Sequence, residues 1–457
     1  MTDYGRRERT DEIRRRNSLS WIVGIAAITL LFDGYDLVVY GAVVPTLLRD
    51  PDQIGALTPG QAGALGSYAL VGVMVGALAA GAVGDRVGRR RVLLVNLVWF
   101  SVGMGLTSFA TSFTAFGFLR FFTGIGVGAL VVTVGALIAE FAPPGRRNFY
   151  NALVYSGVPA GGVVAALLAL LTSDALGWRG LFLIGALPLV VLLPAALLRL
   201  PESPKWLLAR GHEERAREIS AHVGIPLSQA ETTPTEQKDK VGFAALATRR
   251  YALATFFLGL MSFSGLLLTY GLNTWLPEIM SRNGYGKSYA LTFLLTLNGG
   301  AIIGGLLGSR IADRLGAKRV IAATFGLAAV SLALLTIGLP LGVLLALVAV
   351  AGVGTLGTQV LIYGFVSNYY DTVARAAGVA WCAGFGRLGG IVGPLVGGAL
   401  VGVGVPPTYA FYVFAGVGLA GLTFTVLVRA ESNAPATSVQ NLQSSDGATV
   451  LEPERAP

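Results

Sequence analysis

The chain has 457 residues, of which 54% are hydrophobic and only 13% are charged, whereas a soluble globular protein carries about 25% charged residues. This composition, with a mean hydropathy of +0.67, excludes an ordinary soluble enzyme and a disordered protein. The single cysteine, Cys382, excludes an intrachain disulfide framework and a multi-cysteine metal site. The net charge of +9 does not indicate nucleic acid, because no soluble domain offers a basic face.

A helix needs about 20 apolar residues to cross a bilayer. The sequence contains twelve such stretches, six on each side of a polar central segment. We expect membrane helices at 20–44, 61–84, 92–112, 114–140, 148–172, 178–199, 250–276, 288–311, 319–338, 341–366, 375–400 and 406–429. The first is expected to be retained rather than cleaved as a signal peptide, because it is too long and contains two aspartates.

The positions of Lys and Arg predict the orientation of these helices. Of the 34 basic residues, 28 lie on the same side as the N-terminus, and an excess of basic residues marks the cytoplasmic side. We therefore expect a multi-pass protein of the cell (inner) membrane with both termini in the cytoplasm. The expected parts are a cytosolic N-terminal tail (1–18), a six-helix bundle (19–199), a cytosolic central loop with a short helix at 206–219 (200–249), a second six-helix bundle (250–430) and a disordered cytosolic tail (431–457).

The two halves repeat each other. The loop Gly84-Asp85-Arg86-Val87-Gly88-Arg89-Arg90 has a counterpart in Ala312-Asp313-Arg314-Leu315-Gly316-Ala317-Lys318. The same offset of 228 residues relates Asp85 to Asp313, Gly76 to Gly304, and Arg147 to Arg375. Duplicated halves around a site at the membrane midplane are typical of secondary transporters.

The first copy of this loop, from Gly81 to Arg90, resembles the signature of the major facilitator superfamily. The second copy departs from it at Ser309 and Ala317. The resemblance implies an all-α integral membrane protein, with twelve transmembrane helices in two pseudo-symmetric six-helix bundles.

Other motifs resemble those of the aromatic acid:proton symporters within this superfamily. They are Asp33-Gly34-Tyr35-Asp36, Asn273-Thr274-Trp275-Leu276-Pro277 and Gly386-Arg387-Leu388-Gly389-Gly390. Two further motifs, from Glu140 to Arg147 and from Pro201 to Leu207, resemble ones that this family shares with sugar porters. The glutamine pairs of sugar porters are absent from 256–270, which favours the aromatic acid family.

Asp33 and Asp36 lie near the middle of the first expected span, three residues apart and therefore on one face of the helix. A carboxylate inside a membrane costs about 2.5–3.5 kcal/mol on insertion scales and usually has a function. We predict that one or both carry the coupled proton, the alternative being a structural hydrogen bond. No histidine can substitute, since His212 and His222 both lie in the central loop.

Two arginines lie inside spans, Arg120 and Arg387. A guanidinium keeps its charge and binds a carboxylate through two parallel hydrogen bonds. Arg387 is predicted to bind the substrate carboxylate. Arg120 is either a second substrate ligand or the partner of Asp36, and a permanent structural ion pair is the alternative for both arginines.

Charged residues at the inner ends of the spans are expected to act as gates, with ordinary solvated charge as the alternative. Glu140 is expected to pair with a basic residue of the first loop when the cytosolic side is shut, and a mirror lock is expected in the second half. The predicted gate residues are Asp85, Arg86, Arg89, Arg90, Glu140, Asp313, Arg314 and Arg375.

Aromatic and amide side chains in the later spans could line a substrate cavity, because aromatic rings stack on rings and amides bond ring hydroxyls. Taken singly, each is more often a packing residue. The candidates are Tyr270, Asn273, Trp275, Asn298, Tyr363, Phe365, Trp381 and Phe385.

The sequence therefore predicts a monomeric secondary transporter that takes up an aromatic carboxylate, of the hydroxybenzoate, protocatechuate, benzoate or gentisate type, together with protons. The alternatives are a proton-linked porter of another organic acid or a sugar, a drug:proton antiporter, and, outside transport, a membrane enzyme or receptor. The sequence shows neither a metal-ligand cluster nor a Walker-type phosphate loop. We expect the lipid bilayer as its surroundings, and no cofactor, metal or nucleic-acid partner.

Overall fold

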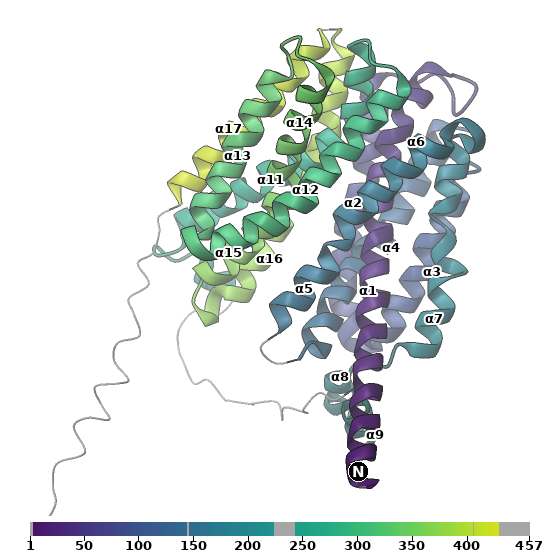
Figure 1. Cartoon of the computed structure of the whole chain (residues 1–457), viewed down its shortest axis with the longest axis vertical. Coiled ribbons are helices and arrows are strands. Elements are labelled where there is room, and N and C mark those ends of the chain that lie inside the picture. Colours follow the sequence, from purple (N-terminus) through teal and green to yellow (C-terminus); the bar gives the residue numbers. More distant parts are fainter. Residues whose placement is uncertain (1–2, 144–145, 224–242, 405, 429–457) are drawn as a thin grey trace, which may run out of the picture.

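A computed structural model describes residues 3–143, 146–223, 243–404 and 406–428 (Figure 1). The secondary structure in these residues is helical, and ten of the helices are long and apolar enough to cross a membrane. The two other expected crossings, 92–112 and 178–199, are covered by the 19-residue helix Arg89–Thr107 and by the shorter apolar segment Leu187–Arg199. The path of the chain is therefore consistent with twelve crossings. The expected tail at 431–457 lies outside the described residues.

The first bundle begins with a helix that is longer than expected. Helix α1 starts at Asp3, well before the predicted span, and continues to Arg49. The bundle contains α1 (Asp3–Arg49), α2 (Pro59–Val87), α3 (Arg89–Thr107), α4 (Phe113–Phe141), α5 (Arg147–Tyr155), α6 (Gly157–Ile184), η1 (Leu187–Leu189) and α7 (Leu192–Arg199).

The second bundle follows the central segment. It contains α11 (Ala252–Arg282), α12 (Lys287–Leu315), α13 (Ala317–Leu334), α14 (Leu341–Gly352), the π-helical η2 (Val353–Gly357), α15 (Thr358–Tyr369), α16 (Thr372–Gly402) and α17 (Pro407–Leu427). Gly88 and Gly316, which are equivalent in the sequence repeat, both have positive φ, at 105° and 87°. The repeated loops therefore turn in the same way between consecutive helices.

Short helices occupy the described part of the central segment: α8 (Pro204–Ala209), α9 (Glu213–Val223) and α10 (Phe243–Leu246). The single helix expected at 206–219 is wrong, because Gly211 adopts a φ of 77° and separates α8 from α9. Such a conformation suits glycine and interrupts a right-handed helix.

The sixth expected span, 178–199, is a broken crossing. Gly177 has non-helical dihedrals at the start of it. Pro188 and Pro194 then lie in η1 and α7, where a proline supplies no backbone N–H to continue a helix. The tenth expected span is likewise interrupted by the π-helical η2 between α14 and α15.

The two bundles meet mainly toward one end of the molecule, which we call the Arg49 end. The opposite end, from which α8, α9 and the N-terminal part of α1 project, is called the α9 end, and the ribbons of the two bundles diverge toward it (Figure 1). Contacts between the bundles join α2 to α16, α6 to α12, and α1 to α11. At the Arg49 end, Ser67 donates a hydrogen bond of 2.6 Å to the Ile391 carbonyl.

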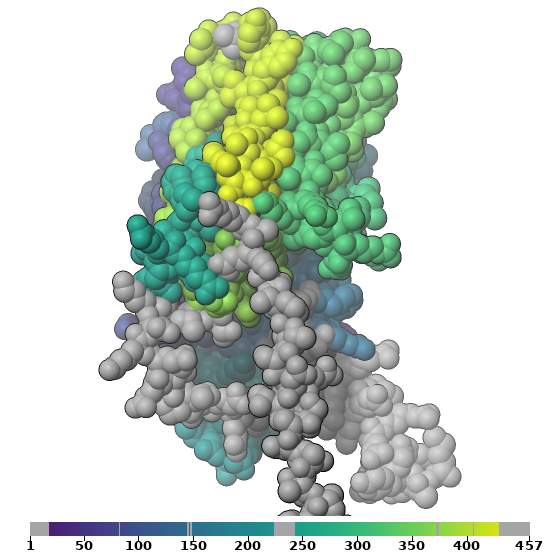
Figure 2. All heavy atoms as spheres, turned by 90° about the vertical axis from the view of Figure 1, so that its left-hand side faces the viewer, coloured from purple at the N-terminus to yellow at the C-terminus, as the bar shows by residue number. Residues whose placement is uncertain are grey.

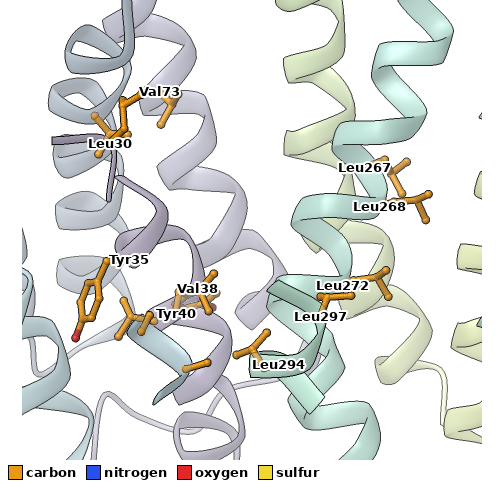
Figure 3. Close-up of a cluster of buried hydrophobic side chains, with 14 of the residues drawn as sticks. Leu30, Tyr35, Val38, Tyr40, Val73, Leu267, Leu268, Leu272, Leu294 and Leu297 are labelled. Atoms are coloured by element: carbon orange, nitrogen blue, oxygen red, sulfur yellow. The ribbon is translucent and has the colours of Figure 1, made fainter. Parts of the chain in front are cut away.

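Buried apolar side chains fill the space between helices of both bundles (Figure 3). The residues labelled there are Leu30, Tyr35, Val38, Tyr40, Val73, Leu267, Leu268, Leu272, Leu294 and Leu297. Glycines bring the backbones close: a Cβ on Gly34 or on Gly161 would overlap the carbonyl of Val158 or of Leu31, respectively. Helices α1 and α6 are therefore in backbone contact near Asp33 and Asp36.

The outward faces of the helices are apolar. Figure 2 looks onto the face of the second bundle where α17 lies. Exposed apolar side chains on α13 and α17 are Leu327, Val330, Tyr409, Tyr412, Val413, Leu419, Val426 and Leu427. Large exposed apolar surfaces of this kind suit contact with lipid.

Candidate functional site

The site is built around the middle of α1. Asp33 and Asp36 lie one turn apart, with Asp36 buried at 4% exposure and Asp33 half-buried. The glycine between them, Gly34, lets α1 approach the backbone of α6. The motif thus places two carboxylates at the centre of the protein, on a helix that also contacts the second bundle.

Asp36 forms an ion pair with Arg120 of α4, and both side chains are buried. The guanidinium of Arg120 also lies over two rings, 5.3 Å from the centroid of Tyr40 and 5.8 Å from that of Phe182. Aromatic faces attract a cation. The structure therefore brings Arg120 and Asp36 together, one of the two arrangements that the sequence left open for this arginine.

Arg387 lies on α16 in the second bundle and is half-buried. Its guanidinium interacts electrostatically with Asp33 of the first bundle and with Tyr270. It forms no hydrogen bond or ion pair with any residue that the structure describes. Two half-buried groups of opposite charge, Asp33 of the first bundle and Arg387 of the second, thus interact electrostatically without forming an ion pair.

A small cavity adjoins the two aspartates. Its volume of about 20 Å³ matches the room that one water molecule needs. The cavity is lined by Asp33, Asp36, Leu37, Tyr40, Gly66, Ala69, Leu70, Val73, Arg120, Val127, Tyr270 and Thr274. This space suits a proton-carrying water and is too small for a ring.

The expected aromatic residues divide into two groups, of which one lies near Arg387. Trp381 stacks on Phe385, with ring centroids 5.3 Å apart and planes at 27°, and its Nε1–H donates to the Thr255 carbonyl. Tyr270 lines the small cavity. Tyr363 lies near Arg387, and Phe365, one turn from Tyr369, contacts that ring instead.

The second group is packed where the bundles meet. Trp275 is fully buried and donates to the Pro394 carbonyl at 2.8 Å. Asn298 donates to Asn273 at 2.8 Å, and both amides are 1% exposed. The backbone of Asn273 also lies against Gly41 of α1, and all three side chains are buried in helix contacts in this conformation.

Some residues near the charges were not predicted. Tyr155, at the end of α5, interacts electrostatically with Asp33 and Arg387. Gln359 donates to Ser262 at 2.9 Å, beside Tyr363, and its Oε1 has no partner among the described residues. Tyrosine and serine are common in membrane helices, so only their neighbours in space distinguish them.

The predicted gate residues of the first half form a network with one another and with the central segment. Arg89 bonds Asp85 at 2.7 Å and lies 3.6 Å from Glu140. The backbone N–H of Arg90 donates to Glu202 at 3.0 Å, and the side chain of Arg210 donates to the Arg86 carbonyl. Glu140 thus pairs with Arg89 in a conformation whose bundles diverge at the α9 end, whereas the sequence predicts this pairing when the cytosolic side is shut.

The second half has no such network among the described residues. Asp313, Arg314 and Arg375 are exposed, and none forms an ion pair with another described residue. Ala317 stands where the first half has Arg89. The second half therefore lacks the cation that, in the first half, joins Asp85 of α2 to α3.

Comparison with known proteins identifies the family. The sequence matches the family model of the Major Facilitator Superfamily over residues 26–305 and 290–451. The benzoate transport protein of Acinetobacter baylyi is 32% identical over 419 residues, covering 89% of both chains. The gentisate transporter of Corynebacterium glutamicum is 35% identical over 424 residues, covering 91% of this chain and 88% of that protein.

The fold agrees with that of solved members. The structure of the xylose transporter XylE from E. coli in a partially occluded inward open conformation superposes with a TM-score of 0.70 at 19% identity, covering 90% of this chain and 98% of XylE. Helical crossings in two bundles and relatives named as carriers of aromatic acids lead to the same assignment. The chain belongs to the aromatic acid transporter family of the Major Facilitator Superfamily, and it is a multi-pass membrane transporter and not an enzyme.

Proposed function

We propose that this transporter takes up an aromatic carboxylate together with protons by alternating access. The observation that carries the proposal is a pair of half-buried, oppositely charged groups, Asp33 of the first bundle and Arg387 of the second, neither of which has a hydrogen-bond or ion-pair partner among the described residues. A fixed cation and a protonatable carboxylate are the two groups that coupled uptake of an acid requires. Relatives named as benzoate and gentisate transporters support a ring acid as the substrate.

In this proposal Arg387 binds the substrate carboxylate. No described residue accepts a hydrogen bond from this guanidinium, so its N–H groups are available to a ligand. A carboxylate can accept two parallel hydrogen bonds from them. The stacked rings of Trp381 and Phe385 come six and two residues before Arg387 on α16. These rings, with Tyr270 and Tyr363, would contact the ring of the substrate.

The two aspartates have different roles. Asp36 already neutralises Arg120, so a proton on Asp36 would leave a buried cation without its partner, which is costly. Asp33 has no hydrogen-bond or ion-pair partner among the described residues and adjoins the small cavity. Asp33 is therefore the proton carrier, and Asp36 with Arg120 holds the site together.

The α9 end is proposed to face the cytoplasm, because most Lys and Arg residues belong to that side. The conformation is then closed to the outside and open to the inside. When the outer side opens, the buried Asn273, Trp275 and Asn298 would become part of the substrate path. The network around Asp85 and the exposed charges around Asp313 would act as gates at the cytoplasmic end.

The bundles are proposed to move as two bodies, 19–199 and 250–430, in a monomeric protein. The cytosolic loop at 200–249 joins them. The tails at 1–18 and 431–457 lie outside the membrane. Movement of whole halves around a central site is the usual mode for transporters with parallel repeats.

The decisive experiment is uptake of labelled hydroxybenzoates, protocatechuate, benzoate and gentisate by cells expressing the protein, with and without a protonophore. We expect acid-stimulated, protonophore-sensitive uptake of at least one of them. Well-expressed protein that carries a sugar or an aliphatic acid and none of these ring acids would overturn the aromatic assignment and leave the fold unchanged.

A further inference from the structure

The charges in the middle of the membrane spans balance. Near the middle of the described spans, the charged side chains are Asp33, Asp36, Arg120 and Arg387. Two carboxylates and two guanidiniums sum to zero when all are ionised. Asp174 and Arg179 lie in the last third of the span Phe149–Ile184, toward the Arg49 end, where they bond Lys287 and Gln53. Glu140 and Glu278 lie near a helix end, and each has a cationic partner there.

The four groups form two unequal pairs. Asp36 and Arg120 belong to the same bundle and are in contact. Asp33 and Arg387 belong to different bundles and interact only through space. The other titratable groups near Asp33 are the tyrosines Tyr40, Tyr155 and Tyr270, which are neutral at physiological pH. Asp33 and Arg387 are therefore the groups of the site that can accept a proton and an anion, respectively.

We infer that each monocarboxylate crosses with one proton, and that no net charge moves in either half of the transport cycle. This inference rests on the proposed function and deepens it. The empty site is neutral with Asp33 ionised. With a proton on Asp33 and a monoanion on Arg387, the site is neutral again. Net charge at the centre of a membrane is disfavoured. The neutral empty state and the neutral loaded state are therefore the two in which the protein can switch between its outward-open and inward-open conformations.

The same charge balance predicts which class of acid is transported. A ring with a second ionised carboxylate would leave the loaded site with one uncompensated negative charge. A second proton would have to go to Asp36, which Arg120 holds. The carrier is therefore matched to monocarboxylates, and aromatic dicarboxylates such as phthalate are poor substrates.

The test uses purified full-length protein in proteoliposomes and labelled gentisate, with protein-free liposomes as background. We expect an inward pH gradient to drive accumulation. Imposing a membrane potential with potassium and valinomycin at fixed pH should change accumulation by less than about twofold. A carrier that moves one net charge would respond about fiftyfold to a potential of about 100 mV, and such a response would overturn the inference.

A variant tests the role of Asp33 in the balance. Asp33→Asn keeps the shape of the side chain and leaves the empty site with one positive charge, which the monoanion alone neutralises. We expect this variant to lose accumulation driven by the pH gradient, by at least tenfold. It should retain exchange of labelled for unlabelled gentisate, now independent of pH. The matched control is Asp52→Asn, an exposed aspartate outside the helices, which should behave as the unmodified protein.

The outcomes separate the inference from the function on which it rests. If gentisate accumulates but responds to the potential, or if Asp33→Asn still accumulates it against a gradient, the charge balance is wrong and the transport function stands. If folded protein carries no ring acid in liposomes or cells, both are overturned.

Discussion

Arg49, the last residue of α1, forms an ion pair of 3.2 Å with Glu278 of α11 and so joins the two bundles. The same guanidinium donates to Ser281 at 2.6 Å. Glu278 is almost fully buried and is also held by Arg282 of its own helix, at 2.7 Å. The contact lies at the end where the bundles meet, so separating the bundles there requires breaking it.

We predict that Arg49→Gln favours opening at the Arg49 end. Glu278 keeps Arg282 as a partner, so the variant does not leave a buried carboxylate uncompensated and should fold. A change of about 1.4 kcal/mol would shift the ratio of open to closed protein tenfold. Distances between spin labels placed on the outer ends of the two bundles would report the change.

Arg282→Gln is the control for this prediction. It removes a neighbouring cation from Glu278 while the contact between Arg49 and Glu278 remains. If Arg282→Gln lengthens the label distances as much as Arg49→Gln, the pair between the bundles is not what holds this end closed. The exposed pair of Lys287 and Asp174 should matter little, since exposed pairs contribute about 0–1 kcal/mol.

Removing Arg120 should destabilise the protein. Arg120→Gln leaves Asp36 as an uncompensated charge in a buried site, which costs about 3–5 kcal/mol. The double variant Arg120→Gln with Asp36→Asn removes both charges and should recover much of that loss. Thermal unfolding in detergent would measure the two variants and the unmodified protein. A double variant less stable than Arg120→Gln alone would contradict the ion-pair assignment.

Replacing Arg387 should affect binding more than stability. This arginine forms no hydrogen bond or ion pair with the described residues, so Arg387→Gln should unfold at nearly the same temperature as the unmodified protein. Loss of a bond to a charged group costs about 1.5–3 kcal/mol, which corresponds to a fall in gentisate affinity of about 10-fold to 150-fold. Titration calorimetry measures the affinity, and an unchanged value would exclude Arg387 as the carboxylate ligand.

The contact between α1 and α6 predicts a difference between two glycines of α1. A Cβ at Gly34 would overlap the Val158 carbonyl, whereas a Cβ at Gly24 would meet nothing within 4 Å. Gly34→Ala should therefore destabilise the protein by about 1–3 kcal/mol through overpacking. Gly24→Ala should be neutral or slightly stabilising, because alanine favours the helix. Unfolding temperatures of the two variants would check this, and equal values would contradict the close approach.

Much of the fold could be predicted because the signal is local. Apolar runs long enough to cross a bilayer define the helices, and the basic loops predict their orientation. The breaks within spans were harder to place. The effect of Gly177 and of Pro188 and Pro194 depends on whether neighbouring helices stabilise the crossing, which the pattern of apolar residues does not encode.

The sequence by itself determined that this is a duplicated, helical membrane protein with two aspartates in its first span and two arginines at its centre. Burying a charge in a membrane is so costly that each such residue stands out in the sequence. Only the tertiary structure decided which charges meet: Arg120 contacts Asp36 on a neighbouring helix, while Arg387 of the second bundle interacts electrostatically with Asp33 without an ion pair. It also placed Trp275 and Asn298 in the contact between helices. Pairing depends on helix rotation and depth, which arise from packing over the whole bundle and not from the spacing of residues along one helix.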